Sequence, residues 1–372
     1  MNWNYMQPVT IHFGNGRIQQ LGDEIQKLGG SRGILICDPF LVKIGLTEKI
    51  IADSNGLIKV VNGEVSPNPD IREVEKCIAL IKENGCDFVV AVGGGSVMDC
   101  AKASATMCKK DLPVRAYMED MSLLPTEHLP LIAAPTTAGT GSEITCVSVL
   151  SDHETMMKKP LNCTAFYPSV AIIDPELTYT MPRHITACTG MDVLCHAVEA
   201  YWSRYHLPVC DALAVHAAKL VLKNLKTACN EPENKLAREK MAEASVIAGL
   251  AFTIPKTTSA HACSYPLTNL LHIAHGEACA LTIDRFLRIN AAHDDGRLQE
   301  LAEMLGYENC EKLADAIRDL KNDIGVMPDL KSFNIDDKMY EALVQGSKHP
   351  NLLNNPVEIT EDMLRALYSE LR

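Results

Sequence analysis

The sequence predicts an α/β domain built on a parallel sheet, followed by an all-α domain. Residues 9–181 alternate short apolar runs with helix-like stretches, the order typical of a parallel sheet covered by helices. After Pro182, apolar residues recur at helical spacing. The length of 372 residues exceeds what one hydrophobic core comfortably serves. We therefore expect two domains, 1–181 and 182–372, with Pro182 marking the boundary.

Each predicted element follows from its local pattern. Short apolar runs, rich in β-branched residues or bounded by turn residues, predict strands. They lie at 33–37, 58–62, 88–92, 131–134 and 170–173. Between them, apolar residues three and four apart predict helices at 15–28, 70–84 and 96–108. The same spacing in the second half predicts helices at 186–201, 210–229, 234–251, 298–305, 310–324, 336–345 and 361–371, with no convincing strand.

Composition excludes several classes of protein. The net charge of −12, without clustered Lys and Arg, argues against a nucleic-acid binder. The 14 cysteines are spread singly along the chain, with no Cys-x-x-Cys pair. This pattern indicates buried free thiols in a reducing compartment and not a disulfide framework. The N-terminus has neither the basic start nor the apolar core of a signal peptide, and no apolar run approaches the length of a membrane helix. We expect a soluble, cytoplasmic protein.

A glycine-rich turn follows the predicted strand 88–92. Gly94, Gly95 and Ser96 open the next helix, so backbone N–H groups and the helix dipole point to where a pyrophosphate could lie. The turn is not the G-x-G-x-x-G fingerprint, and it could merely pack strand against helix. Asp38 ends the first predicted strand, 33–37, where a carboxylate can bind an adenosine ribose and repel a 2′-phosphate. Asp38 could also simply begin a turn with Pro39.

A hydroxyl-rich stretch, PTTAGTGSE at 135–143, follows the predicted strand 131–134. Thr136, Thr137 and Thr140 offer hydroxyl and backbone groups that can bond ribose and phosphate oxygens. The alternative is a plain Thr/Gly turn. With the glycine turn, these residues predict a Rossmann-like, dinucleotide-binding first domain.

Two stretches of the second half offer metal ligands. Asp192 and His196 are four residues apart, on one face of a predicted helix, and His261 and His275 lie in the stretch 256–280. Three imidazoles and one carboxylate suit Fe(II) or Zn(II). An Asp and a His four apart are by themselves more often an ordinary polar pair.

These stretches resemble the iron-containing (metal-dependent) alcohol dehydrogenase family. GGGSVMDCAK is similar to the family's Gly-Gly-Gly-Ser-x-x-Asp-x-x-Lys, and PTTAGTGSE matches its most characteristic stretch residue for residue. The run from His261 through Pro266 to His275-Gly276 resembles its metal-binding segment, with Ala274 in place of the usual proline. Further matches, in consistent order, are Phe13-Gly14, IDPEL at 173–177 and GMDVLCHAVEAYWS at 190–203.

The resemblance implies a full set of roles. NAD(H) would be the dinucleotide, because an aspartate at Asp38 goes with NAD in the family, and Asp99 and Lys158 would join the cofactor-binding residues. One divalent metal, Fe(II) or Zn(II), would be held by Asp192, His196, His261 and His275. His261 and His275 would also be catalytic. We further expect a homodimer or larger homo-oligomer, with neither a nucleic acid nor a membrane as partner.

Two positions depart from the family pattern. Tyr265 stands where many members have a second histidine, which leaves the route of the alcohol proton open; the phenol could relay a proton or bond the substrate. Lys256, with Thr257 beside it, replaces a small or apolar residue. The phrase KTTSAHACSYPLT resembles the branch that reduces two-carbon aldehydes bearing an acid group, and an ammonium suits such a substrate. The alternative is an ordinary solvated lysine.

We therefore expect NADH-dependent reduction of a short aldehyde to its alcohol, with a metal in the cleft between the domains polarising the carbonyl. The substrate of first choice is sulfoacetaldehyde or phosphonoacetaldehyde. Alternatives are a general alcohol or diol dehydrogenase (ethanol, propanol, 1,3-propanediol or lactaldehyde) and a catalytically silent scaffold. Dehydroquinate synthase and glycerol-1-phosphate dehydrogenase share the architecture, but they resemble the two key stretches less well.

Overall fold

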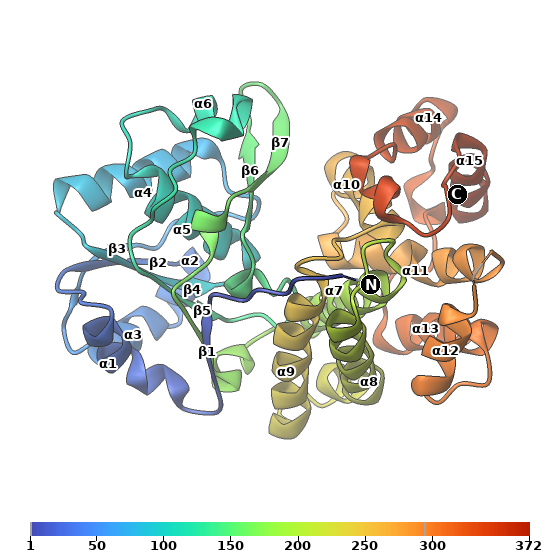
Figure 1. The fold of residues 1–372 in the computed structure, drawn as a ribbon, viewed down its shortest axis with the longest axis horizontal. Helices are drawn as coiled ribbons and strands as arrows, with labels where there is room; N and C mark the ends of the chain where they lie inside the picture. The colour runs from blue at the N-terminus through green and yellow to red at the C-terminus, as the bar shows by residue number, and fades with distance from the viewer. Residues whose placement is uncertain (1, 294) are drawn as a thin grey trace. The chain divides into compact units, whose positions relative to one another are not determined.

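The computed structural model describes residues 2–293 and 295–372. They divide into two compact units (Figure 1). The sheet unit comprises residues 6–137 and 141–178. The helical unit comprises residues 2–5, 138–140 and 179–372.

A six-stranded parallel sheet forms the centre of the sheet unit, which confirms the predicted α/β class. Its strands lie in the order β1 (Thr10–Phe13), β8 (Val170–Ile173), β5 (Leu131–Pro135), β4 (Phe88–Gly93), β2 (Gly33–Ile36) and β3 (Ile58–Asn62). The inner strands are buried on both faces, which is why they are continuous apolar runs without alternation.

Helices cover both faces of this sheet. Alternate strand residues point to opposite sides, so Ile34 and Val89 belong to one core and Leu35 and Val90 to the other. The first core includes residues of α4 (Ile71–Glu83) and α5 (Gly95–Met107), and the second includes α1 (Leu21–Lys27) and α3 (Leu46–Asp53). The shorter α2 (Pro39–Lys43) and α6 (Val114–Glu119) complete the unit.

The strand order contains a topological switch. From β2 the chain moves outward to β3, and it then returns to the other side of β2 to form β4. In parallel sheets of this type, ligands bind beyond the carboxyl ends of the strands at such a switch. The position at the ends of β2 and β4 is therefore a physically favoured ligand site.

The helical unit contains no strand among its described residues, as the sequence predicts. Its core surrounds α7 (Arg183–Trp202), which is buried along nearly its whole length, with α8 (Pro208–Asn230) and α9 (Lys235–Phe252) beside it (Figure 1). The others are α10 (Ser259–Leu271), α11 (His275–Ala291), α12 (Arg297–Met304), α13 (Cys310–Ile324), α14 (Asp337–Gly346) and α15 (Glu361–Leu371). None of the described helices has the length and apolarity needed to cross a membrane.

Several elements differ from the sequence prediction. The edge strand β1 and the antiparallel pair β6 (Val147–Asp152) and β7 (Met157–Asn162) were not predicted, because polar residues interrupt their apolar residues and leave no continuous apolar run. The predicted helix 15–28 is wrong at its start: Gly16 is left-handed, and a 3-10 turn precedes α1. α10 and α11 were missed because α10 contains Pro266 and α11 is buried around most of its surface.

Candidate metal and cofactor sites

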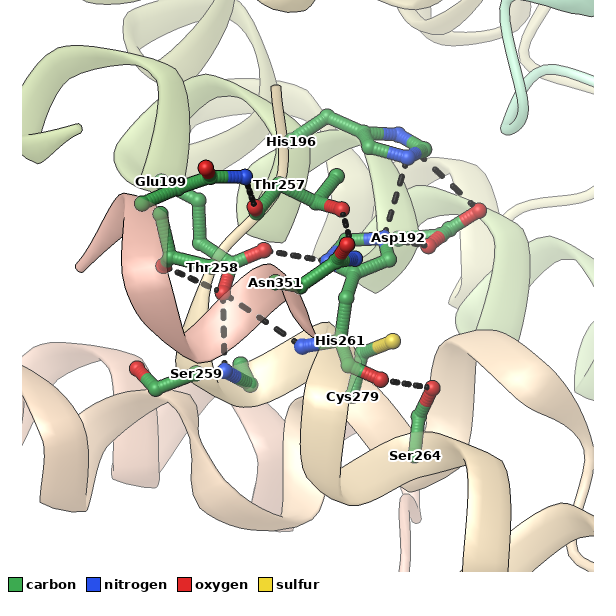
Figure 2. A network of polar contacts seen from close by, with 12 residues as sticks. Asp192, His196, Glu199, Thr257, Thr258, Ser259, His261, Ser264, Cys279 and Asn351 are labelled. Carbon is green, nitrogen blue, oxygen red and sulfur yellow. Dashed lines mark hydrogen bonds and ion pairs between the residues drawn. The ribbon is translucent and has the colours of Figure 1, made fainter. Parts of the chain in front are cut away.

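The four predicted metal ligands lie together in the helical unit (Figure 2 shows three of them). Asp192 and His196 are one turn apart on α7, and their spacing places both on one face. His261 lies in the first turn of α10, and His275 is the first residue of α11. The turn between these two helices is closed by His272, whose left-handed conformation ends α10.

The distances among these side chains suit one small cation. Nε2 of His261 lies 3.0 Å from Nε2 of His196 and 3.4 Å from Oδ1 of Asp192. Oδ1 of Asp192 is 3.9 Å from Nε2 of His275. Metal–ligand bonds of about 2.0–2.2 Å place neighbouring ligand atoms roughly 3 to 3.5 Å apart. The contacts of His261 with His196 and Asp192 match this spacing, and the Asp192–His275 distance is longer. Asp192, His261 and His275 offer ligand atoms within 4.8 Å of one another, so these side chains can hold the metal that the family resemblance implies, and His196 contacts this group through His261.

Two polar atoms of the cluster are buried without a hydrogen bond, Oδ1 of Asp192 and Nδ1 of His196. A buried carboxylate oxygen without a donor costs about 1–3 kcal/mol or more. The facing Nε2 atoms of His196 and His261 cannot satisfy both rings when both are neutral acceptors there. A cation between Oδ1 of Asp192 and these two Nε2 atoms would compensate the carboxylate oxygen and both facing nitrogens.

Two of the predicted ligands have strongly shifted pKa values. Burial alone would raise the pKa of Asp192, but the neighbouring imidazoles hold it far below its usual range. Burial lowers the pKa of His196 to about 4, so this ring is neutral near pH 7, as a metal ligand must be. The cluster thus presents an ionised carboxylate beside a neutral imidazole.

Glu199, which the sequence analysis did not single out, orients His261. Its carboxylate accepts a hydrogen bond from Nδ1 of His261, and it also accepts from the Thr258 hydroxyl at 2.8 Å and the Ala260 N–H at 2.7 Å (Figure 2). Although burial opposes ionisation, these contacts keep the pKa of Glu199 below its usual value. A carboxylate on Nδ1 fixes the tautomer whose Nε2 is free to bind a metal.

Cys279 is a second residue that sequence reasoning missed. Its thiol lies with Asp192, His261 and His275 in a group whose potential ligand atoms are all within 4.8 Å of one another. Sγ is 3.9 Å from Nε2 of His275. A single buried cysteine resembles the other small apolar residues of α11, so only its position one turn after His275 could have signalled it.

A backbone contact at Gly276 brings α7 and α11 together. A Cβ atom at this position would lie 2.1 Å from the carbonyl oxygen of Cys188 and 2.9 Å from Cβ of Asp192. Any side chain here would push apart the helices that carry Asp192 and His275. The His275-Gly276 pair in the sequence therefore has a packing reason.

In the sheet unit, several predicted cofactor residues lie at the topological switch. Asp38 follows β2, and Gly94 is the N-terminal cap of α5 directly after β4. One oxygen of Asp38 accepts from the N–H groups of Phe40 and Leu41 and so caps α2. Asp38 therefore has the turn-forming role that the sequence analysis gave as the alternative. Its second carboxylate oxygen has no hydrogen bond among the described residues.

The glycine turn and the hydroxyl-rich loop meet in the structure. A Cβ atom at Gly94 would lie 3.3 Å from the Thr137 methyl group, and the Thr136 N–H donates to the Gly93 carbonyl at 3.0 Å. Gly95 is the first residue of α5. The loop then leaves the sheet unit, since Thr140 belongs to the helical unit.

Asp99 is tied into the protein on both oxygens. It accepts from the Ser142 hydroxyl at 3.0 Å and from the Val149 N–H at 3.0 Å. The buried Lys102, one turn later on α5, donates to the same Ser142 hydroxyl at 2.7 Å, and burial lowers the pKa of this lysine to about 8. Both residues therefore anchor the chain that follows the hydroxyl-rich loop.

Ser96 and Lys158 are joined through Asn68, which was not predicted. The Ser96 hydroxyl accepts from the Asn68 N–H at 3.1 Å, and Lys158 donates to the Asn68 side-chain oxygen at 2.9 Å. Burial lowers the pKa of Lys158. A single residue, Asn68, therefore bridges Lys158 and the glycine turn, although these two lie far apart in sequence.

Lys256 occupies a strained turn between α9 and α10. Its φ is +66°, in the left-handed region that lysine rarely adopts. The turn is fastened on both sides: Ser203 donates to the Pro255 carbonyl at 2.6 Å, and Asn351 donates to the Thr257 hydroxyl at 2.8 Å. Within the described residues, the Lys256 ammonium has no hydrogen bond or ion pair.

Hydrogen bonds and a ring contact link this turn to the predicted metal ligands. Lys256 donates its N–H to the Phe252 carbonyl at 2.9 Å, and the Phe252 ring stacks on His196 with centroids 4.2 Å apart. On its other side, Thr258 bonds Glu199. The backbone on each side of Lys256 is therefore bonded to a residue, Phe252 or Glu199, that contacts a predicted metal ligand.

Tyr265 lies one turn after His261 on α10, where burial raises the pKa of its phenol. Its ring contacts that of His349, with centroids 4.4 Å apart. His349 comes from a distant part of the chain, so sequence reasoning could not pair the two. A histidine is thus present beside the position where the family often has one.

Both parts of the chain match models of known protein families. Residues 8–175 match the family described as iron-containing alcohol dehydrogenase, and residues 186–371 match the C-terminal region of the Fe-containing alcohol dehydrogenase family. A solved sulfoacetaldehyde reductase from Bifidobacterium kashiwanohense, in complex with NAD+, is 52% identical with a TM-score of 0.98, covering 100% of this chain and 99% of that one.

Two curated relatives are more distant. Long-chain-alcohol dehydrogenase 1 of Geobacillus thermodenitrificans is 34% identical over 97% of this chain and 94% of its own length. A sulfoacetaldehyde reductase of Bilophila wadsworthia is 30% identical over 98% of this chain and 97% of its own. The resemblance seen in the sequence is confirmed: the chain belongs to the iron-containing alcohol dehydrogenase family and is an oxidoreductase.

Proposed function

We propose that this enzyme uses NADH to reduce a two-carbon aldehyde bearing an acid group, with sulfoacetaldehyde, giving isethionate, as the first choice and phosphonoacetaldehyde as the second. The proposal rests on Lys256, which has a strained backbone and an ammonium without an ion pair among the described residues. Its N–H is bonded to Phe252, whose ring stacks on the predicted ligand His196. The 52% identity to a sulfoacetaldehyde reductase over the whole chain supports it.

Asp192, His196, His261 and His275 hold the metal in this proposal. A bound divalent ion would supply Lewis-acid polarisation of the aldehyde carbonyl, and bound NADH would supply the hydride. Glu199 keeps His261 in the tautomer that leaves Nε2 unprotonated. Burial of the cluster strengthens the electrostatic interactions within it.

Lys256 and its neighbours hold the acid group of the substrate. An anion that leaves water needs fixed donors, and the net charge of −12 opposes its approach at long range. Backbone strain of this kind costs about 1–3 kcal/mol and persists where the surroundings impose it, which is common at ligand sites. Thr257, the neighbour of Lys256, and Tyr265, four residues after His261, are the further donors in this proposal.

For the cofactor, the switch of the strand order supports a dinucleotide at Asp38 and the glycine turn. The N-terminus of α5 at Gly94, Gly95 and Ser96 receives the pyrophosphate. Thr136, Thr137 and Thr140 bond the remaining cofactor oxygens, and Lys158 lies at the ribose. Asp99 acts by positioning the loop after these threonines.

The proton that completes the alcohol passes through Tyr265. Its hydroxyl can donate and accept, and the contact with His349 places a titratable ring next to it. Burial lowers the pKa of His349 and so favours its neutral form. A neutral imidazole has one N–H donor and one acceptor nitrogen, so it can pass a proton on.

The test replaces Lys256 with methionine, which is similar in length but uncharged. Lys256→Met should raise the Michaelis constant for sulfoacetaldehyde by about tenfold or more, corresponding to one charged hydrogen bond of roughly 1.5–3 kcal/mol. Propionaldehyde should be affected little. Lys219→Met, which removes an exposed lysine of α8, is the matched control and should change neither constant.

A general alcohol or diol dehydrogenase is the second candidate, favoured by the similarity to a long-chain-alcohol dehydrogenase. The same kinetic panel separates the two. If the native enzyme prefers propionaldehyde or lactaldehyde, or if Lys256→Met impairs both substrates equally, the acid-aldehyde proposal is wrong.

A further inference from the structure

A second group of metal-binding side chains lies outside the cluster described above. His184 and Cys188 are one turn apart at the start of α7, and Glu277 lies in the first turn of α11. Nε2 of His184 is 3.5 Å from Sγ of Cys188 and 3.8 Å from Oε2 of Glu277. The potential ligand atoms of the three residues all lie within 4.8 Å of one another.

The hydrogen bonds at this group leave atoms available. Oε1 of Glu277 accepts from the Met327 N–H at 3.0 Å, but Oε2 faces His184 beyond hydrogen-bond distance. Cys188 and Glu277 are buried, whereas the His184 side chain is 59% exposed. A buried carboxylate is costly unless a cation or donors compensate it, and the exposed imidazole leaves the group open to solvent.

We propose that His184, Cys188 and Glu277 form a second metal site, for a borderline divalent ion such as Zn²⁺ or Co²⁺. A thiolate and an imidazole select such ions over Mg²⁺ and Ca²⁺, which prefer oxygen ligands. Bonds of about 2.3 Å to sulfur and about 2.0 Å to nitrogen and oxygen place tetrahedral ligand atoms roughly 3.3–3.5 Å apart. The 3.5 Å between His184 and Cys188 matches this spacing, and the 3.8 Å between His184 and Glu277 is slightly longer. Three protein ligands leave a fourth position for solvent.

The second site uses the same two helices as the first. Cys188 precedes Asp192 by one turn of α7, and Glu277 follows His275 by two residues on α11. The close contact of Gly276 with the Cys188 carbonyl fixes the spacing of the two helices at this point, so the backbones of Cys188 and Glu277 are held near each other before any ion binds. No residue is shared, and each site can therefore be removed without the ligands of the other.

The experiment titrates the full chain, already loaded with Zn²⁺ at the first cluster, with Co²⁺ alone. Bound cobalt is measured by metal analysis after desalting, and a thiolate ligand by its charge-transfer absorption. Cys188→Ser and His184→Ala should each lose one equivalent of cobalt and the thiolate band. Because His184 is exposed, His184→Ala keeps the test valid where the buried Cys188 variant fails to fold.

Cys279→Ser and His216→Ala serve as controls, since Cys279 belongs to the first cluster and His216 is an exposed histidine of α8. Both should keep the extra equivalent and the band. The proposal is overturned by equal cobalt content in the native chain, Cys188→Ser and His184→Ala. It is equally overturned by a thiolate band that only Cys279→Ser removes, because the thiolate would then belong to the first cluster.

Discussion

Replacing Glu199 with glutamine removes one charge from the cluster while keeping the shape of the side chain. The native carboxylate accepts from His261 Nδ1, the Thr258 hydroxyl and the Ala260 N–H. An amide offers a single acceptor oxygen and adds two donors. Where its nitrogen faces His261, the ring must accept at Nδ1 and carry its proton on Nε2, the atom that would otherwise bind the metal.

The expected cost can be worked out from these contacts. Losing a charged hydrogen bond costs about 1.5–3 kcal/mol, and loss of a histidine's supporting partner typically weakens metal binding by about 10- to 100-fold, or roughly 1.4–2.7 kcal/mol. The two estimates agree. We therefore expect Glu199→Gln to raise the Kd for Zn²⁺ about 10- to 100-fold.

The assay is competition for Zn²⁺ against a chromogenic chelator at fixed pH, with thermal unfolding of the metal-free protein alongside. Thr258→Val is the matched variant, because it removes one donor to Glu199 but leaves the carboxylate facing His261. It should change the Kd less than Glu199→Gln does. If Glu199→Gln lowers the Tm of the metal-free protein and leaves the Kd unchanged, Glu199 supports packing only and the reasoning is refuted.

Three further predictions concern other residues. His275→Ala should lower metal content and turnover together and leave NAD binding intact; full metal occupancy by metal analysis would contradict the ligand set. Asp38→Asn keeps the cap on α2 but removes the charge, so it should shift the kinetic preference from NADH towards NADPH, and an unchanged ratio would place Asp38 away from the ribose. Burial raises the pKa of Glu143 to about 7, so the folded state binds this proton more tightly than the unfolded state, and the native chain loses stability as the pH rises from about 4.5 to 7. At pH 7.5, the free energy of unfolding of Glu143→Gln should therefore exceed that of the native chain by up to about 3 kcal/mol, and at pH 5 by much less. Equal differences at the two pH values, measured by chemical denaturation, would refute this.

The sequence predicts the sheet well because its inner strands are buried on both faces. Runs such as 88–92 are apolar throughout, and a Gly or Pro bounds them. β6 and β7 were missed because their stability comes from pairing with each other, a contact that no local pattern records. Pro266 similarly hid α10, since a proline inside a helix is disfavoured unless tertiary packing compensates for it.

The predicted metal ligands were recognisable from spacing and resemblance. Asp192 and His196 share a helical face, and His275-Gly276 is a motif. Glu199 and His349 were not recognisable, because each acts on a residue that is far away in sequence. Their contacts exist only after the helices pack. The roles of the cofactor residues, the choice of substrate and the oligomeric state stay predictions.

The contact at Gly276 limits how the metal preference of this enzyme can be changed by protein engineering. The spacing of α7 and α11 is set by main-chain atoms in contact, so substitutions elsewhere on these helices have little scope to widen or narrow the cluster. Adaptation to an ion of another size or softness must therefore come from the ligands themselves, or from residues that touch them, such as Glu199 and Cys279. A library intended to change the bound ion should randomise those positions and leave the glycine intact.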